Sequence, residues 1–268
     1  MYLTVNDAKT YCYTGGKAFD AAKPTLIFIH GVLNDHSVWI LQTRYLAHHG
    51  WNVLAVDSPG HCRSGGEPPA SVEDTADFVI ALMDAAGLQK AALVGHSFGS
   101  LVALEAAARA PERVSQLVLL GTAFPMKVSL ALLEASLKEP LKALKMVNIF
   151  SRATLAPPPS SMGPGTWVYG ASMALGRRVL ASNPRVNLFH IGFKACDNYS
   201  HGEEAIARVA CPVLFVLGSV DQMTPTKAAQ GLIKKALNAK VVYLPGGHHQ
   251  MSETPDAMLA ALTGFLKS

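Results

Sequence analysis

The chain has 268 residues, of which 50% are hydrophobic and 16% charged, and its formal net charge is +4. This composition excludes extensive disorder and can bury one large core with room for an inserted subdomain. The basic residues are spread along the chain, and their densest helical stripe, Lys138, Lys142 and Lys145, is typical of a solvated helix face. No nucleic-acid partner is therefore indicated.

The termini and cysteines indicate the compartment. Residues 1–7 contain neither a basic leader nor an apolar stretch. No run approaches the ~18 apolar residues that a membrane span needs. The four cysteines, Cys12, Cys62, Cys196 and Cys211, show no paired spacing. We expect reduced thiols in a cytoplasmic protein without a membrane span, and the sequence leaves the oligomeric state open.

Short apolar runs alternate with longer helical stretches, which predicts an α/β fold with a mostly parallel sheet. We expect a leading hairpin from residues 3–5 and 10–13, then strands at 25–30, 52–57, 90–95, 114–120, 213–218 and 240–244. Helices are expected at 37–49, 71–86, 98–110, 225–236 and 254–267.

The alternation stops between Thr122 and Cys211, which indicates an insertion. We expect residues 1–123 and 210–268 to form the core, and residues 124–209 to form helices at 128–138, 141–150, 166–181 and 186–196, joined by proline-rich loops. Most apolar side chains of the insertion are expected to pack it onto the core and a minority to face a pocket. The whole set of apolar side chains considered in the insertion is Met126, Phe150, Met162, Trp167, Met173, Phe189 and Phe193.

The segment Gly95-His96-Ser97-Phe98-Gly99 lies between a predicted strand and a predicted helix. This is the context of a nucleophile elbow, in which a sharp turn needs small residues two positions before and after the serine. Ser97 is therefore the candidate nucleophile. A serine hydroxyl needs a base to take its proton and a carboxylate to orient that base.

Candidates for the acid and the base lie at the carboxyl ends of later strands, the edge of the sheet where ligands bind. Asp221 follows the strand at 213–218 and is our acid, although an Asx-turn would also explain it. His248 follows the last strand and is our base, with adjacent His249 as the alternative. His96 is interpreted as a packing residue. Cys62 and Cys196 could border the pocket, but nothing marks either as a reactive thiolate.

Acyl transfer also needs two donors that stabilise an oxyanion. The amide of Phe98, at the start of the helix after Ser97, is one candidate. The second is expected in the loop after the strand at 25–30, where Gly31 permits a tight turn. We choose the amide of Val32 over that of Leu33. No metal motif, phosphate loop or dinucleotide pattern occurs, so we expect neither a metal nor another cofactor.

The chain resembles the α/β-hydrolase superfamily in the order and spacing of its motifs. These are His30-Gly31, the segment 57–64, the segment 95–99, Asp221 and His248. The resemblance implies an eight-stranded α/β-hydrolase fold, Ser97 as nucleophile, His248 rather than His249 as base, Asp221 as its orienter, and the amides of Val32 and Phe98 as the oxyanion hole. It also implies that residues 124–209, inserted after the sixth strand, act as a lid. Cys62 stands where the family usually has glycine.

This resemblance leaves several hydrolase classes open. The absence of a His-Gly-Gly-Gly loop argues against the hormone-sensitive-lipase-like group, and serine at position 97 argues against haloalkane dehalogenases and epoxide hydrolases. Lactonases, cofactor-free peroxidases and acyltransferases remain. We expect a serine hydrolase of a small or medium, hydrophobic carboxylic ester. The alternatives are a carbon–carbon bond hydrolase of aromatic breakdown products and a ligand-binding receptor on the same fold.

Overall fold

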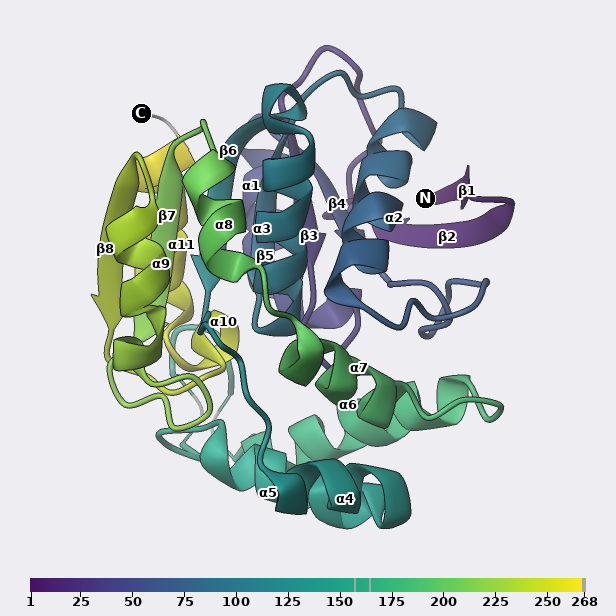
Figure 1. The fold of residues 1–268 in the computed structure, drawn as a ribbon, viewed down its shortest axis with the longest axis vertical. Coiled ribbons are helices and arrows are strands. Elements are labelled where there is room, and N and C mark those ends of the chain that lie inside the picture. Colours follow the sequence, from purple (N-terminus) through teal and green to yellow (C-terminus); the bar gives the residue numbers. More distant parts are fainter. Residues whose placement is uncertain (157, 164, 267–268) are drawn as a thin grey trace.

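The computed structural model describes residues 1–156, 158–163 and 165–266, and its centre is an eight-stranded sheet (Figure 1). The strand order is β1-β2-β4-β3-β5-β6-β7-β8. The strands are β1 (Tyr2–Val5), β2 (Ala8–Tyr13), β3 (Thr25–Ile29), β4 (Asn52–Val56), β5 (Ala91–His96), β6 (Val114–Leu120), β7 (Val213–Gly218) and β8 (Ala239–Leu244). Only the pairs β1·β2 and β2·β4 are antiparallel. The predicted α/β fold and its mostly parallel sheet are confirmed.

The sheet separates two hydrophobic layers, because successive side chains of a strand point to opposite faces. In β3, Ile27 packs in one buried cluster and Phe28 in the other. The first cluster contains residues of α2 (Val72–Ala85), α3 (Phe98–Arg109), α8 (Gly202–Arg208) and α9 (Gln230–Lys235). The second contains residues of α1 (Ile40–His48), α10 (Gln250–Glu253) and α11 (Pro255–Leu266). Both faces are thus covered, which explains why β3 to β7 read as apolar runs.

The helix boundaries differ from expectation in a few places. The helix expected at 37–49 begins as a 3₁₀ turn, η1 (His36–Trp39), and the one expected at 225–236 begins as η3 (Thr226–Ala229). Three short helices were not expected: η2 (Pro111–Arg113), α8 and α10. Each has at most seven residues, too few for a clear helical periodicity. The last residue of the helix expected at 254–267 lies outside the described residues.

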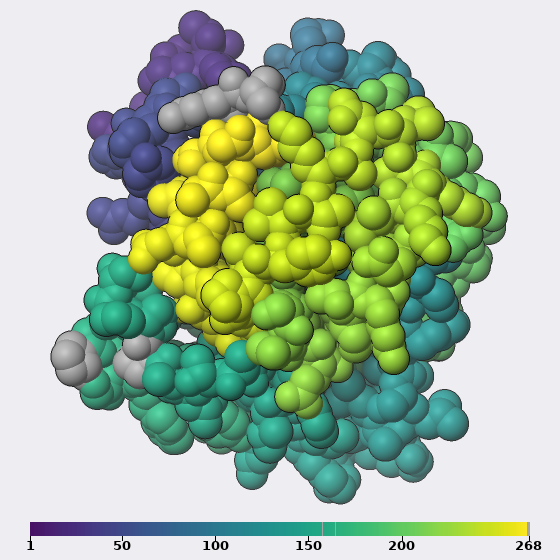
Figure 2. Space-filling view, turned by 90° about the vertical axis from the view of Figure 1, so that its left-hand side faces the viewer, coloured from purple at the N-terminus to yellow at the C-terminus, as the bar shows by residue number. Residues whose placement is uncertain are grey.

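Four helices of the insertion gather at the end of the sheet where the parallel strands end (Figure 1). They are α4 (Leu130–Lys138), α5 (Pro140–Phe150), α6 (Val168–Ser182) and α7 (Leu188–Asn198), close to the four expected ranges. They share a third buried cluster, which also includes Leu33 of the core. Figure 2 shows this part of the chain, in teal, as a layer beneath the yellow C-terminal residues.

Within the part of the chain that the structure describes, no helix combines the length and the apolar character required to cross a membrane.

Candidate active site

Ser97 lies on a strained turn between β5 and α3. Its φ is 54° and its ψ is −121°, a conformation that non-glycine residues rarely adopt. The turn is so tight that a Cβ on Gly95 would collide with the backbone of Gly99, and a Cβ on Gly99 with the carbonyl of Ile29. The two glycines are therefore required sterically. The turn brings Ser97 to the edge of the sheet, where it lines a cavity.

Asp221 and His248 meet beside this turn. His248 Nδ1 lies 2.8 Å from Asp221 Oδ2, and both side chains are buried. Burial raises the pKa of Asp221, whereas the charge and hydrogen bond of His248 and the hydrogen bonds of Thr224 lower it. The lowering is the larger effect, so the pKa of Asp221 is below its ordinary value. A carboxylate at Nδ1 leaves Nε2 as the proton acceptor. Ser97 and His248 line the same cavity, although no hydrogen bond joins them in the described residues.

Two residues that sequence reasoning missed support the histidine. Thr224 Oγ1 lies 2.7 Å from Asp221 Oδ2 and 3.0 Å from His248 Nδ1. Gly121, at φ 50°, lies against the ring, because a Cβ there would be 3.1 Å from Nδ1. The sequence signal that could have indicated Gly121 is its position directly after the strand β6. Asp221 Oδ1 also accepts the amides of Met223 and Thr224, so the Asx-turn that was the alternative for Asp221 exists as well, on the oxygen that His248 does not use.

The neighbouring histidines have other contacts. His96 is buried and its Nε2 donates to the carbonyl of His248 at 2.9 Å. Burial and the proximity of His248 lower the pKa of His96 to about 3, so it is neutral. His249 also lines the cavity, but its ring has no hydrogen bond in the described residues; burial, Arg152 and the other two histidines hold its pKa well below the ordinary range. Of the two candidate bases, only His248 contacts a carboxylate through its ring in the described residues.

The loop after β3 approaches Ser97 closely. A Cβ on Gly31 would lie 3.2 Å from Ser97 Cβ and 3.0 Å from His96 Nδ1. The ring of His30 joins this loop to the loop after β4. Its Nδ1 donates to the Gly31 carbonyl at 2.9 Å and its Nε2 accepts from the Ser58 amide at 3.2 Å. In the described part of the chain, the amides of Val32 and Phe98 donate to no other protein group. Both are therefore available to an oxyanion.

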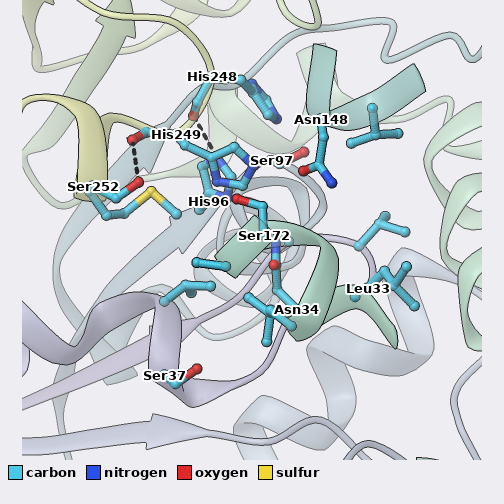
Figure 3. Close-up of a pocket in the computed structure, with 18 of the residues that line it drawn as sticks. Leu33, Asn34, Ser37, His96, Ser97, Asn148, Ser172, His248, His249 and Ser252 are labelled. Carbon is cyan, nitrogen blue, oxygen red and sulfur yellow. Dashed lines mark hydrogen bonds between the residues drawn. The ribbon is translucent and has the colours of Figure 1, made fainter. Parts of the chain in front are cut away.

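Two lobes of one site meet at Ser97. Figure 3 shows residues that line the larger lobe. The larger has a volume of about 720 Å³ and is bordered by α5, α6 and α7; the smaller has about 290 Å³ and is lined mainly by apolar residues. Both are lined by Val32, Ser97, Val147, Phe193, Met223 and His248. Such volumes suit small or medium ligands. Cys196 lines the smaller lobe, and burial raises the pKa of its thiol.

More apolar residues of the insertion face the site than the expected minority. Met126, Phe150, Met162, Phe189 and Phe193 line one or both lobes. Of the other two, Met173 is buried in the insertion and Trp167 is 73% exposed.

A family model described as alpha/beta hydrolase fold matches residues 24–255. The chain belongs to this family. It shares 26% identity over 249 residues with the dihydrolipoyllysine-residue acetyltransferase component of the acetoin cleaving system of Pseudomonas putida, covering 90% of this chain and 63% of that protein. Its alignment with a protein of Mycobacterium phage D29 covers 36% of that relative. The chain thus spans less than two thirds of each of these two curated relatives.

Solved structures of other α/β-hydrolases share the whole architecture. The enol-lactonase from Burkholderia xenovorans LB400 has a TM-score of 0.83 at 20% identity, with 100% of each chain covered. An esterase from Exiguobacterium antarcticum also has a TM-score of 0.83, at 18% identity, with 100% of this chain and 99% of that chain covered. At these identities the likeness shows the fold, and the chemistry must be argued from the residues.

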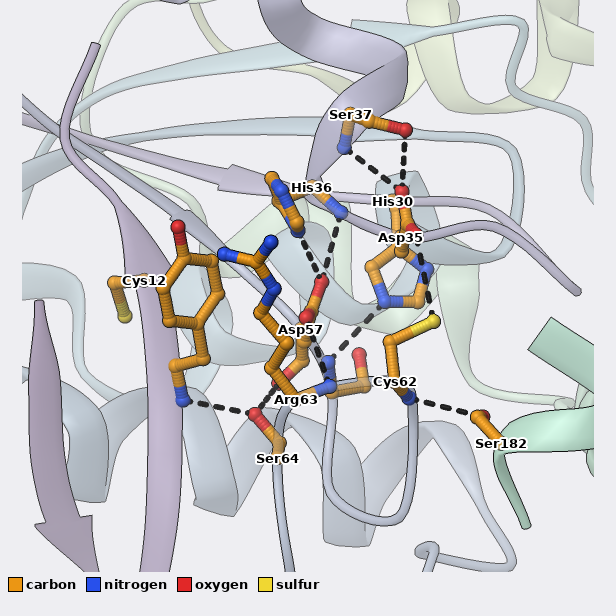
Figure 4. Close-up of polar contacts among 12 residues, drawn as sticks. Cys12, His30, Asp35, His36, Ser37, Asp57, Cys62, Arg63, Ser64 and Ser182 are labelled. Atoms are coloured by element: carbon orange, nitrogen blue, oxygen red, sulfur yellow. Dashed lines mark hydrogen bonds and ion pairs between the residues drawn. The ribbon is translucent and has the colours of Figure 1, made fainter. Parts of the chain in front are cut away.

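Figure 4 shows one polar cluster of this α/β-hydrolase chain, which includes Ser37, a residue that also lines the larger lobe. Asp35, His36 and Asp57 offer ligand atoms within 4.8 Å of one another. Protein donors already occupy them: Asp57 accepts the His36 amide and ring and the Arg63 amide, and Asp35 accepts Ser37. The cluster is therefore interpreted as support for the loops after β3 and β4.

Cys62 joins this cluster to the insertion. Its backbone lies in the left-handed region that favours glycine, with a φ of 46°. Its amide donates to Ser182 Oγ at 3.0 Å, and its thiol donates to Asp35 Oδ2 at 3.3 Å. Asp35 also pairs with Arg178 of α6 at 2.6 Å. Burial and the Asp35 charge raise the pKa of the thiol to about 12, which makes Cys62 an unreactive thiol.

Proposed function

We propose that the protein is a serine hydrolase that cleaves a small or medium carboxylic ester, or a related acyl substrate, through an acyl-enzyme on Ser97. The observation that carries this proposal is the meeting of the strained Ser97 turn with the His248–Asp221 pair at one cavity. The free amides of Val32 and Phe98 beside Ser97 support the same chemistry.

In the proposed reaction, His248 Nε2 takes the proton of Ser97 Oγ as the oxygen attacks the ester carbonyl. Asp221 accepts the Nδ1–H and stabilises the imidazolium. The amides of Val32 and Phe98 stabilise the oxyanion of the tetrahedral intermediate. His248 then gives its proton to the leaving alkoxide, and the acyl group remains on Ser97. Water, deprotonated by His248, attacks this acyl-enzyme, which releases the carboxylic acid and restores the serine.

We also propose that α4 to α7 act as a lid over the site. Their apolar residues line both lobes, which would exclude water from the acyl-enzyme and favour hydrophobic substrates. The insertion would extend to residue 209, and its last helix, α8, would anchor it, because Ala205 and Ile206 are buried in the first hydrophobic cluster. The four free thiols support the further proposal of a cytoplasmic location.

Intact mass spectrometry after exposure to a fluorophosphonate tests the nucleophile, with Ser97→Ala as the control. Turnover of short and medium p-nitrophenyl esters is measured in parallel. We expect one adduct that is absent from Ser97→Ala, together with ester turnover that the variant lacks.

Other outcomes would change the proposal. Wild-type esterase activity in Ser97→Ala would refute the assignment of the nucleophile. Labelling of Ser97 without turnover of any simple ester would favour the carbon–carbon hydrolase or, if a ligand then altered the protease sensitivity of the lid, the receptor.

A further inference from the structure

Arg152, between α5 and α6, lines the larger lobe with its donors only partly used. Its Nη2 donates to Ser172 Oγ at 2.7 Å and its Nη1 to Ser252 Oγ at 3.3 Å. Both serines line the same lobe (Figure 3). The Nε atom is buried and has no acceptor in the described residues. Since a guanidinium has five N–H donors, two neutral serine oxygens leave most of its capacity free.

No acidic side chain in the described part of the chain forms an ion pair with Arg152. The negative charge of Glu253 acts on Arg152 through space, but the carboxylate oxygens of Glu253 bind backbone amides instead of the guanidinium. Glu253 Oε2 accepts the amides of Ala153 at 2.8 Å and Gly247 at 3.3 Å, and Oε1 accepts that of His249 at 3.2 Å. Glu253 therefore fixes the backbone around the base and compensates the Arg152 charge only from a distance.

The lining of the larger lobe makes this charge significant. Among the described residues that line it there are two arginines and no aspartate or glutamate. The second arginine, Arg178, already has a carboxylate partner in Asp35. Among the described residues, Arg152 is thus the cation of the lobe that has no carboxylate partner.

We propose that Arg152 binds a carboxylate of the substrate, so that the preferred substrates are esters or lactones with two unlike arms. One arm carries a free carboxylate into the larger lobe, and the other places an apolar group in the smaller lobe. This inference rests on the proposed Ser97 chemistry. A guanidinium suits it because it forms charge-assisted hydrogen bonds to carboxylates.

A purely structural role for Arg152 makes a different prediction. The two serine contacts join the segment after α5 to α6 and α10, so removing the side chain could loosen the lid. Loosening would affect all esters alike, whereas loss of a carboxylate partner would affect only substrates that carry the carboxylate. The decisive measurement is therefore a selectivity between matched esters.

The first experiment compares kcat/KM for two pairs of esters. One pair places the charge on the acyl arm: the mono-4-nitrophenyl ester of glutaric acid and its methyl-capped counterpart. The other places it on the alcohol arm: O-butanoyl glycolate and its methyl ester. We expect the wild-type protein to prefer the carboxylate member of at least one pair by about tenfold or more. Arg152→Met should abolish this preference, and Arg152→Lys should retain part of it.

Arg178→Met is the matched control, because it removes a cavity arginine that has its own carboxylate. It should leave most of the preference for the carboxylate member in place, whereas Arg152→Met should abolish it. The proposal is overturned if the wild-type protein treats both members of both pairs alike. It is also overturned if Arg152→Met lowers kcat/KM for both members of the preferred pair equally.

A binding measurement separates this proposal from that of the serine chemistry. Ser97→Ala should bind the preferred carboxylate ester, measured by calorimetry, about tenfold more tightly than Ser97→Ala/Arg152→Met does. Equal affinities would overturn the role of Arg152 even if Ser97 is the nucleophile. A difference in affinity would uphold it even if fluorophosphonate labelling placed the nucleophile elsewhere.

Discussion

The neutral state of His96 predicts a measurable dependence of stability on pH. His96 is 1% exposed, and its pKa is lowered from 6.5 to about 3 by burial first and by His248 second. Between these pH values the unfolded chain binds a proton that the folded chain does not. The contribution of His96 to stability is therefore complete above pH 6.5 and is lost as the pH falls through that window.

The size of this effect follows from the shift. One pKa unit corresponds to about 1.4 kcal/mol, so acidification from about pH 7.5 to about pH 5 should remove about 2 kcal/mol through His96 alone. His96→Gln keeps a side-chain N–H for the carbonyl of His248 but does not titrate. Urea unfolding of both proteins at both pH values gives the free energies of unfolding.

We expect the acid-induced loss of stability to be about 2 kcal/mol smaller in His96→Gln than in the wild-type protein. The titrations of histidines that do not interact with His96 are the same in both proteins, so their effects cancel in this comparison. Equal losses, within about 0.5 kcal/mol, would refute the reasoning that a neutral His96 is part of the folded state.

Three further predictions concern the site. Asp221→Asn should lower kcat by about 10⁴ without unfolding the chain, measured with a p-nitrophenyl ester, because Nδ1 of His248 loses its charged acceptor; a loss below about tenfold would contradict the pair. His248→Ala should lower kcat by several orders of magnitude and His249→Ala by far less, since the His249 ring contacts no carboxylate; the reverse order would make His249 the base. Cys62 should resist iodoacetamide near pH 8 in peptide mapping, because its pKa is raised to about 12, and rapid alkylation of the folded protein would disprove this.

The sheet could be predicted because its strands are buried on both faces. All residues of β3, β4, β5 and β7 are buried, and each appears in the sequence as a short apolar run. The short helix α8 could not be predicted, since seven residues carry too little periodicity. Its position depends on contacts of Ala205 and Ile206 with the core, which the local sequence does not encode.

For the site, the sequence predicted the candidates that lie directly after strands, and the structure brings His248 and Asp221 into contact. It did not predict Thr224 or Arg152. Thr224 contacts Asp221 from the following turn, and Arg152 reaches the cavity from a loop whose course is fixed by residues about a hundred positions away. Such side-chain directions depend on tertiary contacts rather than on spacing.

The loop that carries the base is attached to the insertion through its backbone. The His248 amide donates to the Ser151 carbonyl at 2.7 Å, and Glu253 accepts the amide of Ala153 at 2.8 Å. A Cβ on Gly247 would lie within 3.1 Å of atoms of Ser151, Arg152 and Ala153, so the two segments touch along their main chains.

This contact determines where the insertion can be exchanged in a chimera. Although residues 151–153 belong to the insertion by sequence, they buttress the loop of His248 and so belong mechanically to the core. A chimera that exchanges the helices before and after this segment can alter the pocket while the base keeps its support. A chimera that exchanges the segment itself replaces part of that support, so the most useful crossover points lie at its two ends.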